Sequence, residues 1–202
     1  MDRIAEPDSL QLEFSRLYPE VILASSSPNR KALLEAGGTK VTVYKPDADE
    51  SRQGTTPSEI VLSIARRKLE AYLGSKSFSP SIPAIAADTL VHIGGDLLGK
   101  PHSLEEARQM LQELSGKPQT VLTACGLKLP GKEPAVFLDE GRVLFRHLSA
   151  AEIEDYLATE EWKGAAGAYR LQKTGWKLVD KIEGDWTTVV GLPLKKLISL
   201  IS

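Results

Sequence analysis

The chain has little of what several classes of protein require. Its 202 residues include a single cysteine, Cys125, so an internal disulfide is excluded. Lysine and arginine number 25 against 27 for aspartate and glutamate, and the net charge of −2 gives no basic field for holding nucleic acid. No apolar run approaches the length of a membrane span, and the first residues lack the apolar core of a signal peptide. We therefore expect a cytoplasmic protein that binds neither nucleic acid nor membranes.

Several well-known catalytic motifs are missing as well. There is no Gly-x-Gly-x-x-Gly fingerprint, no Walker phosphate loop and no recognisable Ser/His/Asp order. The three histidines, His92, His102 and His147, lack the spacing of metal ligands. Cys125 lies in the apolar stretch 121–127, which favours a small buried side chain over a nucleophile.

The most informative segment that is present covers residues 21–38. A short apolar run and three serines lead to Pro28, which suits the first position of a helix, with Ser27 as the N-cap. Arg30 and Lys31 then place positive charge at the positive end of the helix dipole, which is unfavourable. A bound anion such as a polyphosphate would compensate this charge, and the other interpretation is a solvated Arg-Lys pair.

Apolar periodicity and turn signals predict helices and strands that interleave. The expected helices lie within 1–20 and at 28–36, 57–73, 103–115 and 149–158, with a last one from 192; the expected strands cover 21–23, 41–44, 82–93, 119–129, 134–139, 142–147 and 178–182, with a turn at 140–141. In the first helix, Leu10, Leu12, Phe14 and Leu17 are the expected packing positions. Since some strands look hairpin-linked, this order predicts an α/β fold with a mixed sheet covered by helices.

Four charged residues stand where they could meet a phosphate or a metal ion. Asp88 leaves an apolar strand and, being partly desolvated, needs a cation, a metal or a hydrogen-bond donor, unless it only caps a turn. Glu50 lies in an acidic run that is either a solvated loop or the source of a second carboxylate for a divalent ion. Lys100, between a glycine and a proline, suits a phosphate, although any surface turn can carry a lysine. Lys68 lies in a predicted helix beside two arginines, where such residues mostly face solvent.

Short motifs occur in a fixed order along the chain. They are Leu-Ala-Ser-Ser-Ser-Pro-Asn-Arg-Lys-Ala-Leu-Leu (23–34), Asp-Glu (49–50), Ala-Arg-Arg-Lys (65–68), Ala-Asp-Thr (87–89), Leu-Gly-Lys-Pro (98–101), Gly-Ala-Tyr-Arg-Leu-Gln (167–172) and Val-Val-Gly-Leu-Pro-Leu (189–194). Over residues 21–194 this order strongly resembles the Maf family of nucleoside triphosphate pyrophosphatases. The resemblance implies a single domain over 21–202 with an N-terminal extension at 1–20. It also implies an elongated mixed sheet flanked by helices, with two lobes around a deep cleft.

The same resemblance implies a reaction. A Maf-like enzyme hydrolyses a nucleoside triphosphate between the α- and β-phosphates with the help of a divalent metal cation, Mg²⁺ or Mn²⁺, and a homodimer is compatible with the resemblance. By position, the implied catalytic residues are Asp88, Glu50 and Lys100, with Glu50 and Asp88 holding the metal. The implied substrate-binding residues are Ser25, Ser27, Asn29, Arg30, Lys68, Thr89 and Gln172, of which Thr89 and Gln172 match positions linked to base selection.

One departure from the family pattern concerns Asn29. Members that select dTTP and UTP typically carry Ser-Pro-Arg-Arg, whereas this chain has Ser-Pro-Asn-Arg at 27–30, which predicts a broader substrate range. Two alternatives stay open: a pyrophosphatase for a modified purine such as 7-methyl-GTP, and a nucleotide-binding regulator of cell division with little catalysis. Gln172 disfavours the first, because a glutamate would be expected there. The intact Asp88, Glu50 and Lys100 disfavour the second.

Overall fold

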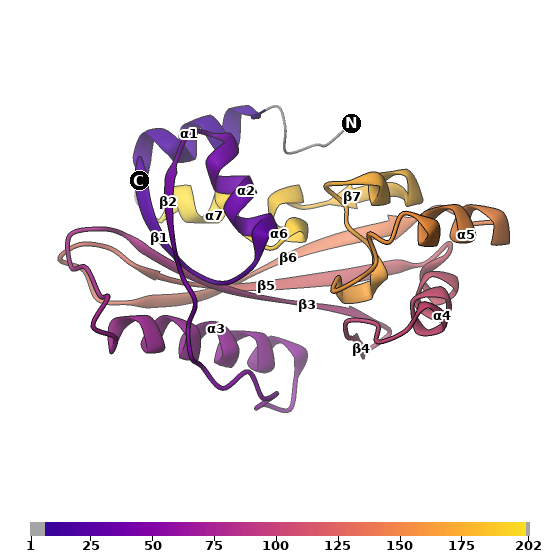
Figure 1. Cartoon of the computed structure of the whole chain (residues 1–202), viewed down its shortest axis with the longest axis horizontal. Helices are drawn as coiled ribbons and strands as arrows, with labels where there is room; N and C mark the ends of the chain where they lie inside the picture. Colours follow the sequence, from indigo (N-terminus) through magenta and orange to yellow (C-terminus); the bar gives the residue numbers. More distant parts are fainter. Residues whose placement is uncertain (1–6, 201–202) are drawn as a thin grey trace.

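The computed structural model describes residues 7–200 and shows a mixed seven-stranded sheet with helices on both faces (Figure 1). The strands are β1 (Glu20–Ala24), β2 (Lys40–Tyr44), β3 (Ala84–Ile93), β4 (Asp96–Leu98), β5 (Pro118–Lys128), β6 (Ala135–Phe145) and β7 (Val179–Glu183). The helices are α1 (Ser9–Leu17), α2 (Pro28–Ala36), α3 (Pro57–Leu73), α4 (Leu104–Leu114), α5 (Ala150–Ala158), α6 (Trp186–Val190) and α7 (Leu194–Ser199), with 3-10 turns at Ala166–Ala168 and Thr174–Leu178. The predicted α/β class is confirmed. Within residues 7–200 no helix combines the length and the apolar character that crossing a bilayer requires.

The strand order β2-β1-β3-β5-β6-β7 creates a break at one edge of β3. β1 pairs with β3 in parallel up to Ala86, and β4 pairs antiparallel with the same edge of β3 from Val91 onward. In the described part of the chain, residues 87–90 therefore have no strand beside them on that edge, while β5 pairs with their other edge. Asp88 and Thr89 lie in this break, where a ligand can approach the middle of the sheet.

The two faces of the sheet carry separate apolar clusters. On one face the helix α3 packs against β3 and β5, and α1, α2, α6 and α7 gather on the other (Figure 1). The start of α3 is fixed by a capping box in which the Thr56 hydroxyl accepts from the Glu59 N–H while the Glu59 carboxylate accepts from the Thr56 N–H. The side of α3 that faces the sheet buries Ile60, Ile64 and Lys68 at intervals of four, so an ammonium group enters an otherwise apolar stripe.

Two expectations about local structure are wrong. The predicted turn at 140–141 does not exist, because β6 runs unbroken from Ala135 to Phe145. A Cβ on Gly141 would lie only 2.8 Å from Cγ2 of Val189, so this glycine allows α6 to pack closely on the strand. In α1, Phe14 is buried as expected and Leu10 packs against the core, but Leu12 and Leu17 are exposed. Tyr18, just beyond the helix, is buried instead and stacks on Phe14.

Candidate active site

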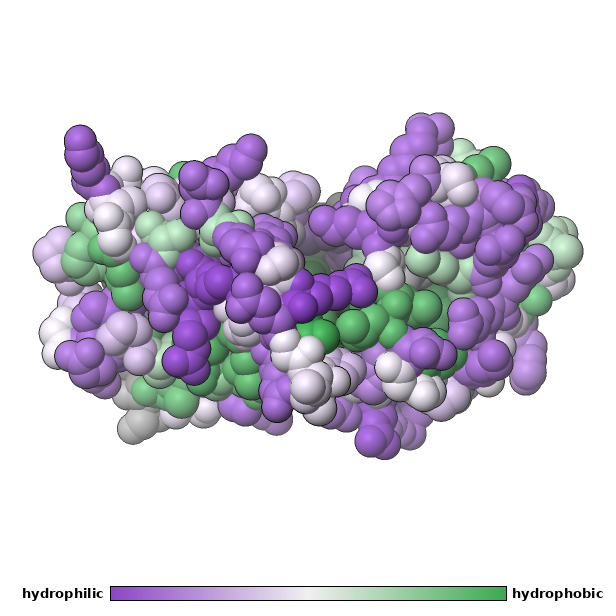
Figure 2. Space-filling view, turned by 90° about the horizontal axis from the view of Figure 1, so that it is seen from below, coloured by the Kyte–Doolittle hydropathy of each residue, from purple (hydrophilic) through white to green (hydrophobic). Residues whose placement is uncertain are grey.

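A cavity of about 290 Å³ opens at the break in the edge of β3. The space-filling view shows a notch that divides the molecule into two lobes along its long axis, which confirms the expected two-lobed shape (Figure 2). All ten residues that the sequence singled out line the cavity: Ser25, Ser27, Asn29, Arg30, Glu50, Lys68, Asp88, Thr89, Lys100 and Gln172. They come from the turn before α2, the first turn of α2, the loop before α3, α3 itself, β3, the turn after β4 and the segment after the first 3-10 turn. The fold thus brings together residues that are distant in sequence.

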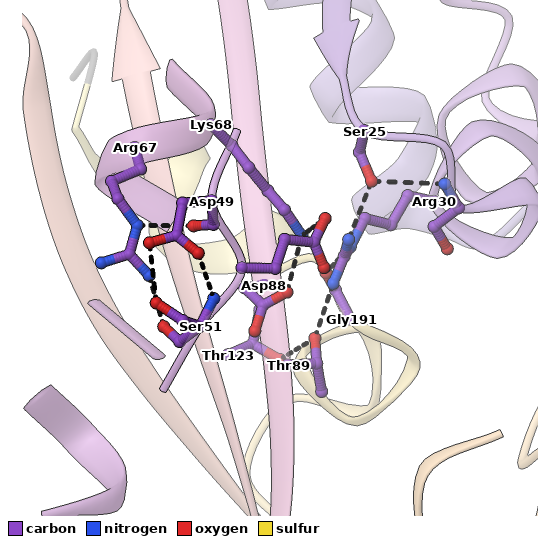
Figure 3. A network of polar contacts seen from close by, with 12 residues as sticks. Ser25, Arg30, Asp49, Ser51, Arg67, Lys68, Asp88, Thr89, Thr123 and Gly191 are labelled. Atoms are coloured by element: carbon purple, nitrogen blue, oxygen red, sulfur yellow. Dashed lines mark hydrogen bonds and ion pairs between the residues drawn. The ribbon is translucent and has the colours of Figure 1, made fainter. Parts of the chain in front are cut away.

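In one wall of the cavity two carboxylates form ion pairs with a buried lysine. The Nζ atom of Lys68 lies 2.8 Å from Oδ1 of Asp88 (Figure 3). It also lies 3.1 Å from Oε1 of Glu50. The side chain of Lys68 is only 7% exposed and that of Asp88 15%, whereas that of Glu50 is 60% exposed. Lys68 therefore does not face solvent. Its buried charge is balanced by the two carboxylates, which it holds close to each other.

The start of α2 forms the opposite wall, and Arg30 is buried within it. Its Nε donates to Gly191 O at 2.7 Å, Nη1 to Ser25 Oγ at 2.8 Å and Nη2 to Thr89 Oγ1 at 2.9 Å (Figure 3). Burial lowers the pKa of this guanidinium, and the charge of Asp88 opposes that shift. A guanidinium has five N–H groups, so two remain for a ligand in the cavity. Of the two cations in the first turn, only Lys31 is a solvated one, paired with Glu35.

The serines before α2 behave differently from the sequence expectation. Ser27 does occupy the N-cap position, but its side chain makes no capping hydrogen bond. Its backbone N–H instead donates to Ser25 Oγ at 3.3 Å, and the same oxygen accepts from Arg30. The hydroxyl of Ser27 and the first N–H groups of α2 are therefore left to a ligand at the helix N-terminus.

Thr89 has its hydroxyl proton committed inside the protein. Thr123 Oγ1 donates to Thr188 O at 2.8 Å, so in the 3.0 Å contact between the two threonine hydroxyls Thr89 is the donor. Because a hydroxyl has a single proton, Thr89 has none left to donate to a nucleobase, while its oxygen accepts from Arg30. Gly191 makes this arrangement possible: its φ is +116°, and a Cβ there would lie 3.1 Å from Thr89 Oγ1.

The other lobe contributes the segment 164–172. Gln172 is buried there, and its Nε2 has no hydrogen-bond partner among residues 7–200. The segment is tied to the turn of Lys100, because the Gly167 N–H donates to Gly99 O at 3.1 Å. Lys100 itself is exposed, and its ammonium has no ion pair or hydrogen bond within the described chain. An unpaired amide donor and an unpaired ammonium thus face one cavity.

Several residues that line the cavity had no role predicted from the sequence. Arg170 contributes a fourth cation: it lines the cavity, its Nε donates to Glu161 O and its Nη2 donates to Lys163 O. Val91 and Val121 provide an apolar surface. Arg170 stands in the quoted motif at 167–172 directly before Leu171 and Gln172, and this proximity was the available signal. The two valines carried no signal, because they look like ordinary strand residues.

The donor set suits a divalent cation only in part. In the part of the chain that the structure covers, no three His, Cys, Asp or Glu side chains come together as a metal cluster. Glu50 and Asp88 offer two carboxylates, and Mg²⁺ is commonly held by one or two carboxylates together with substrate phosphates. The pair therefore fits a cation that arrives with a phosphorylated ligand. Cys125 is excluded from the chemistry, because it is buried and burial raises the pKa of its thiol to about 12.

Comparison with known proteins identifies the family. A family model described as Maf-like protein matches residues 20–202. The chain belongs to the Maf family. It is 42% identical over 183 residues to a dTTP/UTP pyrophosphatase of Thermus thermophilus, covering 91% of this chain and 94% of that protein. It is also 42% identical over 181 residues to a dTTP/UTP pyrophosphatase of Pyrococcus abyssi, covering 90% and 94% respectively.

Solved structures of another protein, Ham1, are similar to this Maf chain at low sequence identity. The Ham1 protein of Staphylococcus aureus superposes with a TM-score of 0.48 at 16% identity, covering 90% of this chain and 97% of that one. A HAM1 protein from Coxiella burnetii gives a TM-score of 0.46 at 15% identity, covering 90% and 98%.

Proposed function

We propose that this Maf protein hydrolyses nucleoside triphosphates between the α- and β-phosphates, releasing a nucleoside monophosphate and pyrophosphate, with dTTP and UTP among its substrates. The relatives named dTTP/UTP pyrophosphatase, at about two-fifths identity over nine-tenths of the chain, support the reaction and the substrate class. The observation that carries the proposal is the pair of carboxylates held by Lys68 across one cavity from the start of α2. Phosphate transfer to water needs such a combination of positive charge and an oriented base.

The triphosphate is assigned to the positive side of the cavity. The two N–H groups that Arg30 keeps, the free ammonium of Lys100 and the remaining N–H groups of Arg170 supply charge-assisted donors. The N-terminus of α2 adds backbone N–H groups and the hydroxyl of Ser27. Together they would hold the β- and γ-phosphates that leave as pyrophosphate.

Asp88 is the proposed general base. It would take a proton from a water molecule as the water oxygen bonds to the α-phosphorus and the bond from that phosphorus to the β-bridging oxygen breaks. The Nζ atom of Lys68, 2.8 Å from Oδ1 of Asp88, holds this carboxylate in place at the cavity. A divalent cation, Mg²⁺ or Mn²⁺, held by Glu50, Asp88 and the phosphates would supply neutralisation of the phosphate charge. Glu50, being more exposed than Asp88, is suited to the outer side of such a site.

Base selection is assigned to Gln172 with Asn29. Uracil and thymine carry carbonyl oxygens that accept hydrogen bonds, and Gln172 has a buried Nε2 without a partner. Asn29 lines the cavity and is shorter than arginine, so it leaves room there. Because the hydroxyl proton of Thr89 is used internally, Thr89 does not donate to the base and instead holds Arg30, which is assigned to the phosphates.

The test is product analysis with labelled water. Purified protein with Mg²⁺ or Mn²⁺ is given dTTP, UTP, CTP, dATP, GTP and 7-methyl-GTP in water enriched in heavy oxygen, and products are separated and weighed by mass spectrometry. We expect monophosphate plus pyrophosphate from dTTP and UTP, with the label in the monophosphate. Diphosphate plus orthophosphate as first products would refute the proposal. Label in pyrophosphate would place the attack on the β-phosphorus.

The same panel separates the alternatives. Preference for 7-methyl-GTP would favour the modified-purine enzyme, which the names of the relatives do not favour. Binding of nucleotides without products would favour the regulator. A cytoplasmic location and a homodimer stay predictions, and fractionation of cells and light scattering of the purified protein would test them.

A further inference from the structure

Glu50 presents a structural problem. Its carboxylate reaches the buried Nζ of Lys68 at 3.1 Å, yet its side chain is 60% exposed and it belongs to the irregular segment 45–56 between β2 and α3. An exposed side chain on an irregular loop loses conformational entropy when it is held in one place. Some part of the protein must therefore fix the backbone of this loop.

Arg67, the neighbour of Lys68 on α3, makes the contacts that do so. Its Nε donates to Asp49 O and its Nη2 to Ser51 O, both at 2.6 Å, and these are the carbonyl groups directly before and after Glu50 (Figure 3). Its Nη1 donates to Ser63 Oγ at 2.7 Å, one helical turn back, which fixes the plane of the guanidinium. One edge of the guanidinium is thus hydrogen-bonded to the loop on both sides of Glu50.

The loop is also shaped from within around the same residue. The carboxylate of Asp49 accepts from the Ser51 N–H at 2.8 Å and from the Ser51 hydroxyl at 2.7 Å. This closes a tight turn over Glu50. Arg67 holds the two ends of that turn (Figure 3), and Lys68 forms an ion pair with the Glu50 carboxylate between them.

We propose that Arg67 is a positioning residue that acts through the backbone of Asp49 and Ser51 to hold the Glu50 carboxylate beside Lys68 and Asp88. The inference rests on the proposed function, since it gives Glu50 a part in the reaction. Arginine is required because two parallel N–H groups on one planar edge match two carbonyl groups, whereas lysine presents a single ammonium. Arg67 needs no contact with the substrate and does not line the cavity.

Kinetics of Arg67→Gln test the role. A small displacement of a catalytic group by a distant change can cost about 10²-fold in rate, so kcat should fall by about that factor while KM changes little. Arg67→Lys should recover only part of kcat. Arg66→Gln is the matched control, because Arg66 precedes Arg67 on the same helix and is exposed. It should leave kcat unchanged.

A double-mutant cycle shows whether Arg67 acts through Glu50. In the Glu50→Gln background, Arg67→Gln should change kcat by less than about twofold, because the group that Arg67 positions is already gone. A full additional loss in that background would overturn the proposal, since Arg67 would then act by another route. Thermal unfolding of each variant checks that the fold is retained.

Amide hydrogen exchange provides a readout that is independent of turnover. Arg67→Gln should speed exchange over residues 45–56, and Arg66→Gln should not. Unchanged exchange would show that Arg67 does not hold the loop. Faster exchange with unchanged kcat would show that holding the loop does not position Glu50 for the reaction. If the wild type hydrolyses no nucleotide in the panel, the proposed function fails on its own, while the exchange experiment still decides whether Arg67 holds the loop.

Discussion

Replacing Arg30 by alanine should destabilise this protein strongly, although the sequence places Arg30 on an exposed-looking first turn. The buried guanidinium joins three parts of the fold: Ser25 after β1, Thr89 on β3 and Gly191 at the end of α6. The hydrogen bonds to Ser25 and Gly191 are buried, and that to Thr89 is partly so. Alanine would leave three acceptors without their donor.

The magnitude follows from those three bonds. A hydrogen bond to a charged group contributes about 1.5–3 kcal/mol. The sum of three such bonds overestimates the loss, because the acceptors border a cavity and water that enters it can replace part of the lost hydrogen bonding. We therefore expect a loss of about 3–5 kcal/mol in the free energy of unfolding, below that sum. For a chain of this size that corresponds to a fall of about 6–20 °C in Tm.

Urea and thermal unfolding followed by circular dichroism measure this loss. Lys31→Ala is the control, since Lys31 is the next residue on α2 and its exposed pair with Glu35 contributes at most about 1 kcal/mol. An Arg30→Ala protein as stable as Lys31→Ala would show that the three hydrogen bonds do not stabilise the fold. Arg30 would then be a ligand contact alone.

Three further predictions concern the reaction and the thiol. Asp88→Asn should lower kcat for dTTP by about 10²–10⁴-fold while the fold survives, and near-normal turnover would remove Asp88 from the role of general base. Asn29→Arg should sharpen the preference for dTTP and UTP over CTP about tenfold or more, measured as ratios of kcat/KM; equal ratios for the two proteins would mean that position 29 does not sense the base. Cys125, whose thiol pKa burial raises to about 12, should not react with a disulfide reagent near neutral pH until urea unfolds the chain, and rapid labelling of the native protein would contradict its burial.

Local sequence patterns predicted the elements well because their causes are local. Pro28 at a helix start, the capping box of Thr56 and Glu59, and the apolar run before Asp88 each act over a few residues, and the structure contains α2, α3 and β3 where they indicate. The inward position of Lys68 could also have been predicted from the sequence, because Lys68 continues the spacing of four from Ile60 and Ile64. The two arginines directly before Lys68 concealed that periodicity.

The remaining features depend on contacts between distant segments. Arg30 meets Gly191 across 161 positions, and no pattern near either residue announces the contact. The sequence around Gly141 is typical of a turn, but the glycine is required because Val189 of α6 packs closely against it. Such requirements arise only when the sheet is assembled, so a sequence interpretation that proceeds segment by segment cannot contain them.

The contacts in the structure give the cations of the cavity different roles. Counted in the sequence, Arg30, Lys68 and Lys100 look like three equivalent cations for a triphosphate. In the structure Arg30 uses three of its five N–H groups on the fold, and Lys68 is neutralised by two carboxylates. Lys100 is the cation of the three whose charge is wholly available to a ligand within the described chain. Building the site and binding the phosphates are therefore carried largely by different cations, and stability and KM should respond to different substitutions.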